Sequence, residues 1–372
     1  MSRRGPQIST AGVARQYTGT AGRTENAQVA VYLTYAAPGG HALIDRELYL
    51  PQSWISDLGR CRAAGIPPGT GFATKPGLAR TMIARALDAG TPASWVAGDE
   101  VYGADPGLRA DREIRQLGYV LATAPHRHIV TAAGTLRADT LTARLPPRVW
   151  QKLPAEAGVK GHRYYDWAWA AIEPGRPGHR HLLVRHSRRT PELAYYRCYA
   201  PGPVPLARLV HIAGLRRTAE EDFAASKALA GLDEHQVRRW TSWYRWVTLA
   251  MLALALLTVA AAAEHTRDPR PAGQVPLTRN EIACLFTVAV PPASDTGYRL
   301  RWSAGRRRHQ HKARTSHYKR QAATTHNAAP GALHDLARVK FTLWAWPAPP
   351  ASLEAGHDAT TTPPRLRSPS RR

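Results

Sequence analysis

Cysteine is scarce in this chain, with three residues in 372: Cys61, Cys198 and Cys284. They lie far apart in the sequence, so neither a disulfide framework nor a paired-cysteine zinc site is expected. This cysteine usage fits a reducing cytoplasm. The first 22 residues contain no apolar core, so we predict no secretion signal.

Acidic residues are also few, because 27 Asp and Glu face 51 Lys and Arg and give a formal net charge of +24. Such an excess predicts a polyanionic partner, with nucleic acid as the best match and no small-molecule substrate. The stretch 306–320 contains no acid, and its phosphate contacts would be independent of base sequence. The residues expected to contact DNA there are Arg306, Arg307, Arg308, Lys312 and Arg314.

Long apolar runs are rare, and the one candidate for a membrane span is Trp246 to Ala263. It is at the short edge of a spanning length and rich in Ala. Arg245 and the neighbouring Trp and Tyr residues resemble an interfacial belt, so a single-span membrane protein is one alternative. Because no second span accompanies it, we predict instead a helix buried in an α/β core and no membrane partner.

The first third of the chain alternates between strand and helix patterns. Residues 28–36 and 41–50 are rich in Val, Leu and Tyr and are separated by APGG, which predicts a hairpin. A helix is predicted over 75–90, and a short apolar strand then stops at Gly98. This alternation indicates an α/β layer with a leading antiparallel hairpin.

The amino-acid composition changes after residue 124, where Gly, Pro, Trp and Tyr become more frequent. Short strands in an irregular insertion are predicted there. Helical patterning returns near Arg216, and the C-terminal end is basic and rich in Pro, Thr, Ala and Ser. The expected segments are 1–124 (first part of an α/β core), 125–213 (β-rich insertion), 214–265 (C-terminal helices of the core), 266–320 (basic extension) and 321–372 (disordered tail).

Two acids are candidates for chemistry. Asp99 ends a strand and enters a Gly-containing loop, a common place for catalytic residues in open α/β sheets; a turn or helix-capping Asp is the alternative. Glu220 follows the insertion. An acid at a strand end and another on a later helix could bind one Mg²⁺, because hard cations that act on phosphates use a few carboxylates.

The surroundings of Glu220 allow two interpretations. On one continuous helix, Arg216, Glu220 and Lys227 would share a narrow stripe, with Glu221 and Asp222 pointing elsewhere. Charge stripes are common on solvated helix faces, and in that interpretation Glu220 simply pairs with Arg216. In the other interpretation, Glu220 is a metal ligand.

Four blocks carry a resemblance to a known family: RQYTGTAGRTENAQVAVYLTYA, ALIDRELYLPQSW, WVAGDEVYG and GLDEHQVRRWTSWYRWVTLAMLALALL. Over residues 15–320 the chain resembles the DDE transposases of bacterial insertion sequences, in the branch with a Tyr-Arg-Glu-Lys signature. The resemblance implies a ribonuclease-H-like mixed sheet with helices, interrupted by a β-rich insertion. It also implies metal-dependent DNA cleavage and strand transfer at element ends, two Mg²⁺ or Mn²⁺ ions, and double-stranded DNA as partner. The resemblance further implies that the active protein is a multimer and that it is cytoplasmic and associated with the nucleoid.

The family signature assigns roles to four residues. Asp99 matches the second catalytic Asp and Glu220 the final Glu, which makes both metal ligands. Arg216 and Lys227 match the signature Arg and Lys, whose implied role is to orient the acid and contact DNA phosphate. The signature Tyr position falls on Ala213, which is a departure from the family pattern.

A larger departure concerns the first catalytic Asp, which in the family lies on a strand shortly before the block GVARQYTGTAG. No acid precedes Glu25 here, so we expect this Asp and its strand to be missing and the truncated chain to be inactive. A non-catalytic DNA-binding remnant is the alternative function. Asp45 matches a different family position. The alternative that Asp45 replaces the first catalytic Asp as a metal ligand is left open.

Two weaker patterns involve histidines and aromatic residues. Three His-x-His pairs lack a Cys or acid that would complete a metal site, so we predict basic loops: His126 with His128, His179 with His181, and His309 with His311. Four aromatic residues of the insertion could stack on a nucleic-acid base, but ordinary packing is the preferred interpretation: Tyr164, Tyr165, Trp167 and Trp169.

Overall fold

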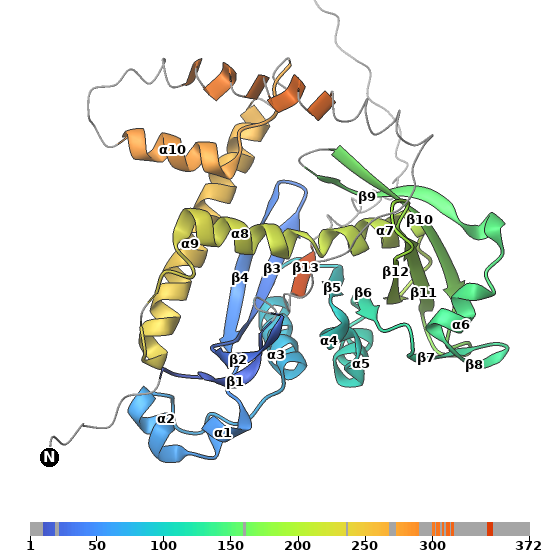
Figure 1. Cartoon of the computed structure of the whole chain (residues 1–372), viewed down its shortest axis with the longest axis horizontal. Coiled ribbons are helices and arrows are strands. Elements are labelled where there is room, and N and C mark those ends of the chain that lie inside the picture. The colour runs from blue at the N-terminus through green and yellow to red at the C-terminus, as the bar shows by residue number, and fades with distance from the viewer. Residues whose placement is uncertain are drawn as a thin grey trace, which may run out of the picture.

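The core of the molecule is a nine-stranded mixed sheet with helices on both faces (Figure 1). The structure, a computed structural model, describes residues 10–18, 22–158, 161–235, 237–267, 273–289, parts of 300–315, and 341–344. The strand order is β4-β3-β13-β5-β6-β12-β11-β10-β9. The mixed α/β arrangement is consistent with the ribonuclease-H-like fold that the resemblance implies.

The strands are β1 (Ala14–Thr18), β2 (Arg23–Ala27), β3 (Ala30–Ala37), β4 (Gly40–Leu48), β5 (Trp95–Gly98), β6 (Gly118–Thr123), β7 (His128–Thr131), β8 (Gly134–Arg137), β9 (Gln151–Gly158), β10 (Gly161–Ala171), β11 (His179–His186), β12 (Leu193–Ala200) and β13 (Phe341–Trp344). The helices are α1 (Gln52–Ile55), α2 (Leu58–Ala64), α3 (Lys75–Asp88), α4 (Glu100–Gly103), α5 (Pro106–Ile114), α6 (Ala138–Ala143), α7 (Leu206–Leu215), α8 (Thr218–Ala230), α9 (Trp240–Arg267) and α10 (Arg279–Ala289), with a short 3₁₀ turn at Pro147–Val149.

The two faces of the sheet are covered by different helices. On one face, Leu33 and Val96 pack with Met82 of α3. On the other face, Ala97 packs with Val210 of α7. Successive strand residues alternate between these two clusters, as the pleat requires, and α8 and α9 continue the second face over β3 and β4 (Figure 1).

The predicted hairpin and the predicted helix after it are both confirmed. β3 and β4 pair antiparallel around Gly40, with a bulge after Leu33. The Thr74 side chain caps α3 by accepting a hydrogen bond from the Gly77 amide. Gly90 follows the helix at φ +79°, a conformation that glycine adopts without strain.

The strands of the insertion extend the core sheet rather than forming a separate layer. β12 pairs antiparallel with β6, and β11, β10 and β9 follow outward in turn. Only the small β7–β8 pair is separate. The short strands expected between 125 and 213 are therefore present. They belong to the same hydrogen-bonded sheet as the strands of the core.

One interior strand of the sheet, β13, comes from the far end of the chain. β13 pairs parallel with β3 and antiparallel with β5, and so joins two parts of the sheet that have no other shared ladder. These four residues form a strand within the segment that was expected to be a disordered tail, and the neighbouring strand edges satisfy their backbone groups. The remainder of 321–372 lies outside the described residues.

The helices after the insertion differ from the prediction in two ways. Helical patterning was expected to return near Arg216; α8 begins at Thr218, and a further helix, α7, precedes it and ends at Leu215. The buried-core assignment of Trp246 to Ala263 is only partly right. Among the described residues α9 is the one helix long and apolar enough to cross a membrane, and 33% of its apolar window is buried. One of its faces packs on β4 and α8, while the other is exposed.

Candidate functional site

The end of β5 positions Asp99. All four residues of β5 are buried, and the chain leaves the sheet at Gly98. The Asp99 carboxylate then caps α4, with Oδ1 accepting a hydrogen bond from the Val101 amide at 2.9 Å. The capping role considered for Asp99 is therefore observed. It does not exclude a ligand role, because a carboxylate has about four lone-pair sites.

The loop that carries Asp99 is held tightly against β6. At Gly103 an added Cβ would overlap the backbone carbonyl of Ala122, so this position requires glycine. Burial lowers the pKa of Lys75 at the start of α3, and the negative charge of Asp99 opposes that shift. Burial also raises the pKa of Tyr102, with a further contribution from Asp99. The charge of Asp99 thus acts on two neighbouring elements.

Glu220 lies in the first turn of α8, on the sheet face opposite to α3. Its side chain is exposed, and its amide donates to the Arg217 carbonyl at 2.8 Å. The same helix is anchored by Phe223, whose ring meets Tyr32 of β3 edge-on at 5.0 Å.

The two signature cations have different environments. Arg216 lies between α7 and α8 and has helical backbone angles. Lys227 is on α8 and forms an ion pair with Asp233 at 3.2 Å. Because α8 includes Glu220 and Lys227, seven residues apart, these two share one helix face. The expected stripe is thus present for this pair, and Arg216 lies outside the helix.

Asp45 is fully engaged elsewhere. Its Oδ2 accepts hydrogen bonds from Arg85 Nε at 3.0 Å and Nη2 at 2.7 Å, and the same guanidinium reaches Glu47 at 2.8 Å. Arg85 belongs to α3, on the face opposite to α8. Both Arg85 nitrogens donate to the same carboxylate oxygen, and hydrogen bonds between charged groups are stronger than neutral ones. The alternative that Asp45 replaces a missing ligand beside Glu220 is therefore not supported.

The basic residues of 306–320 are described in part, and Arg306 lies outside the described residues. Arg308 and Lys312 are exposed, while Arg307 and Arg314 are half-buried. Arg307 donates to the Val275 carbonyl at 3.4 Å, just before α10. This places the described part of the basic run beside the α9–α10 end of the molecule.

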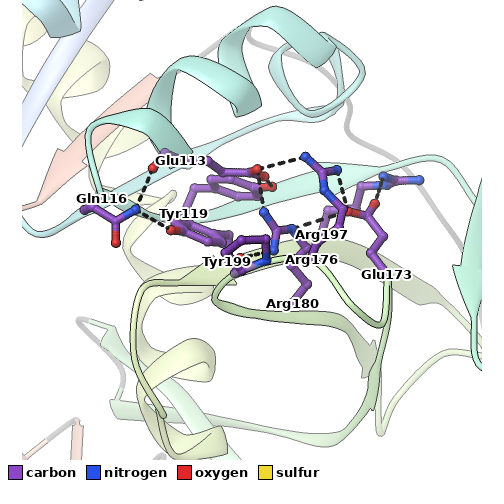
Figure 2. A network of polar contacts seen from close by, with 9 residues as sticks. Glu113, Gln116, Tyr119, Glu173, Arg176, Arg180, Arg197 and Tyr199 are labelled. Carbon is purple, nitrogen blue, oxygen red and sulfur yellow. Dashed lines mark hydrogen bonds and ion pairs between the residues drawn. The ribbon is translucent and has the colours of Figure 1, made fainter.

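A polar network fixes the insertion to the helix that follows the Asp99 loop (Figure 2). Glu113 of α5 accepts hydrogen bonds from Arg180 at 2.6 Å and from the Tyr119 hydroxyl at 2.8 Å. Glu173, in the turn after β10, binds Arg197 at 2.9 Å and lies 3.4 Å from Arg180 Nε. Arg180 therefore bridges the two carboxylates, one from the core and one from the insertion.

Backbone strain is concentrated in the same network. Among the described residues, the non-glycine positions with positive φ are Gln116 at 53° and Glu173 at 52°. Gln116 donates to the Tyr199 hydroxyl at 3.2 Å, and the Arg180 guanidinium lies over the Tyr199 ring at 5.0 Å. Left-handed backbone costs roughly 1–2 kcal/mol per residue, so the surrounding ion pairs must hold both residues in place.

The sequence did not indicate one buried acid, Asp222. Its side chain has no exposed surface, and its Oδ1 lies 2.7 Å from both His41 Nδ1 and Arg279 Nη1. The three residues join the start of β4, α8 and α10. Asp222 was expected only to point away from Glu220, and nothing in its local sequence signals partners 181 and 57 residues away.

Among the weaker candidates, the prediction of basic loops is wrong for His128, which begins β7, and for His179 and His181, which lie on β11. Trp167 is buried in the core and Trp169 stacks on His181 at 4.3 Å, so packing is confirmed for both, while Tyr164 stays exposed. His309 lies outside the described residues. Within the described part of the chain, no group of three or more His, Cys, Asp or Glu side chains is placed to hold a metal ion.

Comparison with known proteins gives one family. Residues 1–178 match the model of the family described as DDE superfamily endonuclease, and no curated protein matches the chain. The match includes β5 and Asp99 and ends before α8, so it does not extend to Glu220. The match covers 178 of the 372 residues, so it is a likeness to DDE superfamily endonucleases over the N-terminal part of the chain.

Proposed function

We propose that this chain is a transposase-type DNA-binding protein of insertion-sequence origin, associated with the nucleoid in the cytoplasm. The observation that carries the proposal is the place of Asp99. It leaves the end of a buried parallel strand within the region that matches the endonuclease family. The net charge of +24 supports duplex DNA as the partner.

Asp99 and Glu220 are the proposed metal ligands. Both offer carboxylate oxygen, the donor that Mg²⁺ and Mn²⁺ prefer, and both come from anchored elements. A bound ion would supply Lewis acidity toward a phosphodiester and activate a water or 3′-hydroxyl. Arg216 at the α7–α8 junction and Lys227 on the face of Glu220 are proposed to hold DNA phosphate beside this pair.

Cleavage is a separate matter, and we propose that the chain as it stands binds DNA without cutting it. Asp99 and Glu220 are the two proposed ligands, while the third acid considered, Asp45, is bound by Arg85 of α3. In the sheet, β13 lies between β3 and β5. Positioning of the nucleophile supplies much of the rate in such reactions, and an incomplete ligand set would lose it.

The second part of the proposed interface is the basic surface near α10. Exposed Arg308 and Lys312, with half-buried Arg307 and Arg314, present positive charge on helical backbone. These residues would contact phosphate without reading bases. Arg306 is proposed to join them on the ground of its sequence position alone.

The test of the metal site uses a matched pair of substitutions. Asp99→Asn keeps the helix cap but removes the charge, and Asp105→Asn does the same at α5, where the Asp105 side chain accepts from the Leu108 amide. We expect Mn²⁺ to raise the melting temperature of the parent and of the Asp105 variant but not of the Asp99 variant. Equal responses of the two variants to Mn²⁺ would contradict the assignment of Asp99.

The cleavage claim is tested with the same proteins. Parent and Asp99→Asn are incubated with Mn²⁺ and a duplex carrying candidate element ends, and no cutting is expected from either. Glu220→Gln and its neighbour Glu221→Gln provide the second matched pair, since Glu221 forms an ion pair with Arg217. Cutting by the parent that Asp99→Asn and Glu220→Gln both abolish would show an active enzyme and refute the claim.

A further inference from the structure

Positive charge is in excess where the insertion meets α5 (Figure 2). Arg176 and Arg180 pair with Glu113 at 3.3 and 2.6 Å. The same two arginines pair with Glu173 at 3.0 and 3.4 Å, and Arg197 joins them at 2.9 Å. Three arginines thus share two carboxylates, so these acids have no charge left to neutralise another cation.

Arg109 adds a fourth guanidinium on the side of the core. It lies one helical turn before Glu113 on α5, so both side chains project from the same face of the helix. Its Nη1 donates to the carbonyl oxygens of Gly103 at 2.5 Å and of Asp105 at 3.3 Å. Within the described part of the chain, Arg109 is bonded to these carbonyls and to no carboxylate. Because Gly103 belongs to the short segment that follows Asp99, this cation is fixed beside that segment.

Arg127 adds a fifth guanidinium on the side of the insertion. It precedes β7, and its carbonyl accepts a hydrogen bond from the Ala138 amide at 2.9 Å, which ties this turn to the start of α6. Asp139, the next residue after Ala138, is already paired with Arg137 at 2.5 Å. The Arg127 side chain is exposed, and it forms no hydrogen bond or ion pair with the other described residues. Its charge is therefore available to a ligand.

Arg109 and Arg127 both lie close enough to Arg197 for their charges to act on it. Arg197 Nη2 donates to the carbonyl of His128, the residue after Arg127, at 2.6 Å. Burial lowers the pKa of Arg197, and the charges of Arg109 and Arg127 lower it further. The charge of Glu173 opposes this lowering. Like charges held together in a partly buried place cost free energy, and an anion bound among them offsets that cost.

We propose that Arg109, Arg127 and Arg197 form a binding site for a phosphate oxyanion between the segment after Asp99 and the insertion. A guanidinium carries five N–H donors in a fixed fork that matches the oxygens of phosphate. Arg197 donates to protein through Nη1 and Nη2 and Arg109 through Nη1, and each guanidinium retains further N–H groups. The inference goes beyond the proposed DNA function, because free inorganic phosphate and a backbone phosphodiester present the same oxygens.

The first experiment measures the melting temperature of the full chain in inorganic phosphate and in sodium chloride of equal ionic strength, without DNA or metal ions. Phosphate at about 10 mM should raise the melting temperature of the parent by roughly 2 °C or more, because it binds the folded chain. Arg109→Gln with Arg127→Gln should lose this shift. Arg127→Gln alone changes an exposed side chain and should lose most of it, which keeps the test decisive if the double variant folds poorly. The matched control, Arg144→Gln with Arg148→Gln, removes the same charge from exposed positions of the insertion and should retain the full shift.

The second experiment identifies the source of the phosphate by a salt titration of duplex binding with the same proteins. If DNA occupies the site, the slope of log K against log salt should fall by roughly one to two more in the variant of Arg109 and Arg127 than in the control. A phosphate shift in melting temperature together with equal slopes would assign the site to free phosphate. If no duplex binds at all, the first experiment decides alone, so failure of the proposed function stays distinguishable. Variants of Arg109 and Arg127 that match the control in both experiments would overturn the proposal.

Discussion

At the scale of single residues, the acids of this chain differ in what holds them. Asp99 caps a short helix, and Glu220 lies exposed on another. Glu113 and Glu173, by contrast, are largely buried among arginines. Asp99 is half-buried and Glu220 exposed, whereas the buried pair connects elements. The first prediction therefore concerns stability at the buried pair.

Replacing Glu173 with Ala is expected to destabilise the fold by about 3–5 kcal/mol, because a buried ion pair that loses one partner leaves uncompensated charge. Arg180 and Arg197, with side chains 4% and 16% exposed, would lose their shared acid. Urea unfolding measures the change. The matched control is Glu192→Ala, whose acid is 59% exposed and 3.6 Å from Arg185, and it should cost less than about 1 kcal/mol. Equal losses would contradict the structural role of the network.

A second residue-scale prediction concerns pH. Burial lowers the pKa of His181, His211 and His235 below the ordinary value of 6.5. The unfolded chain therefore takes up protons before the folded protein does, so this contribution to stability is complete above pH 6.5 and decreases as the pH falls below it. The nearby His179 lowers the pKa of His181 further, and Arg208 does the same for His211. Asp233 opposes the lowering of the His235 pKa.

Melting temperatures measured between pH 8 and pH 5 check this direction. His181 is the most informative position because its ring stacks on Trp169. His181→Phe keeps an aromatic partner for Trp169 and removes the titrating group, so the variant should lose less stability on acidification than the parent. A steeper acid dependence in the variant would show that the shift of His181 has the opposite sign.

At the scale of elements, local sequence patterns predicted the helices and strands that are formed by contacts between residues close in the sequence. The hairpin of β3 and β4, helix α3 and strand β5 followed from alternation, helix periodicity and glycine positions, and all are present. β13 could not be predicted, because Phe341–Trp344 is a four-residue run whose partners lie about 240–310 residues earlier. The apolarity of α9 indicated a helix but not which face is covered, since composition does not reveal neighbours.

In the candidate site, too, the local features could be predicted and the long-range contacts could not. Asp99 was predictable because a strand end and a glycine-containing loop are local features. The break between α7 and α8 was not, since Arg216 and Arg217 are compatible with a continuous helix. The buried triad of His41, Asp222 and Arg279 depends on contacts among three separate elements, and no spacing in the sequence signals it.

β13 gives the element-scale prediction. Thr342→Pro removes a backbone donor from a strand that has neighbours on both sides, and should destabilise the protein by about 3 kcal/mol or more. Amides of Leu33 to Ala36 and of Trp95 to Gly98 should then exchange faster with solvent. Thr342→Ala retains the donor and should cost at most about 1 kcal/mol. A proline variant as stable as the alanine variant would show that β13 contributes nothing to the sheet.

At the scale of the whole molecule, charge and architecture indicate one partner. A net charge of +24 on a mixed α/β core produces a positive field that attracts polyanions from solution. The ordered basic residues near α10 and the cations around Glu220 come from separate parts of the chain. Binding that depends on many such contacts is driven by counterion release and is tolerant of base sequence.

The most direct test of the account is a salt titration of binding between the full chain and two fluorescent duplexes of unrelated sequence. We predict that both bind, that log K falls linearly with log salt, and that their slopes agree, with several phosphates neutralised. Arg308→Ala with Lys312→Ala should reduce the slope by roughly one to two for both duplexes. No binding at low salt, or affinity that does not change with salt, would contradict the central claim that this chain is a phosphate-directed DNA-binding protein.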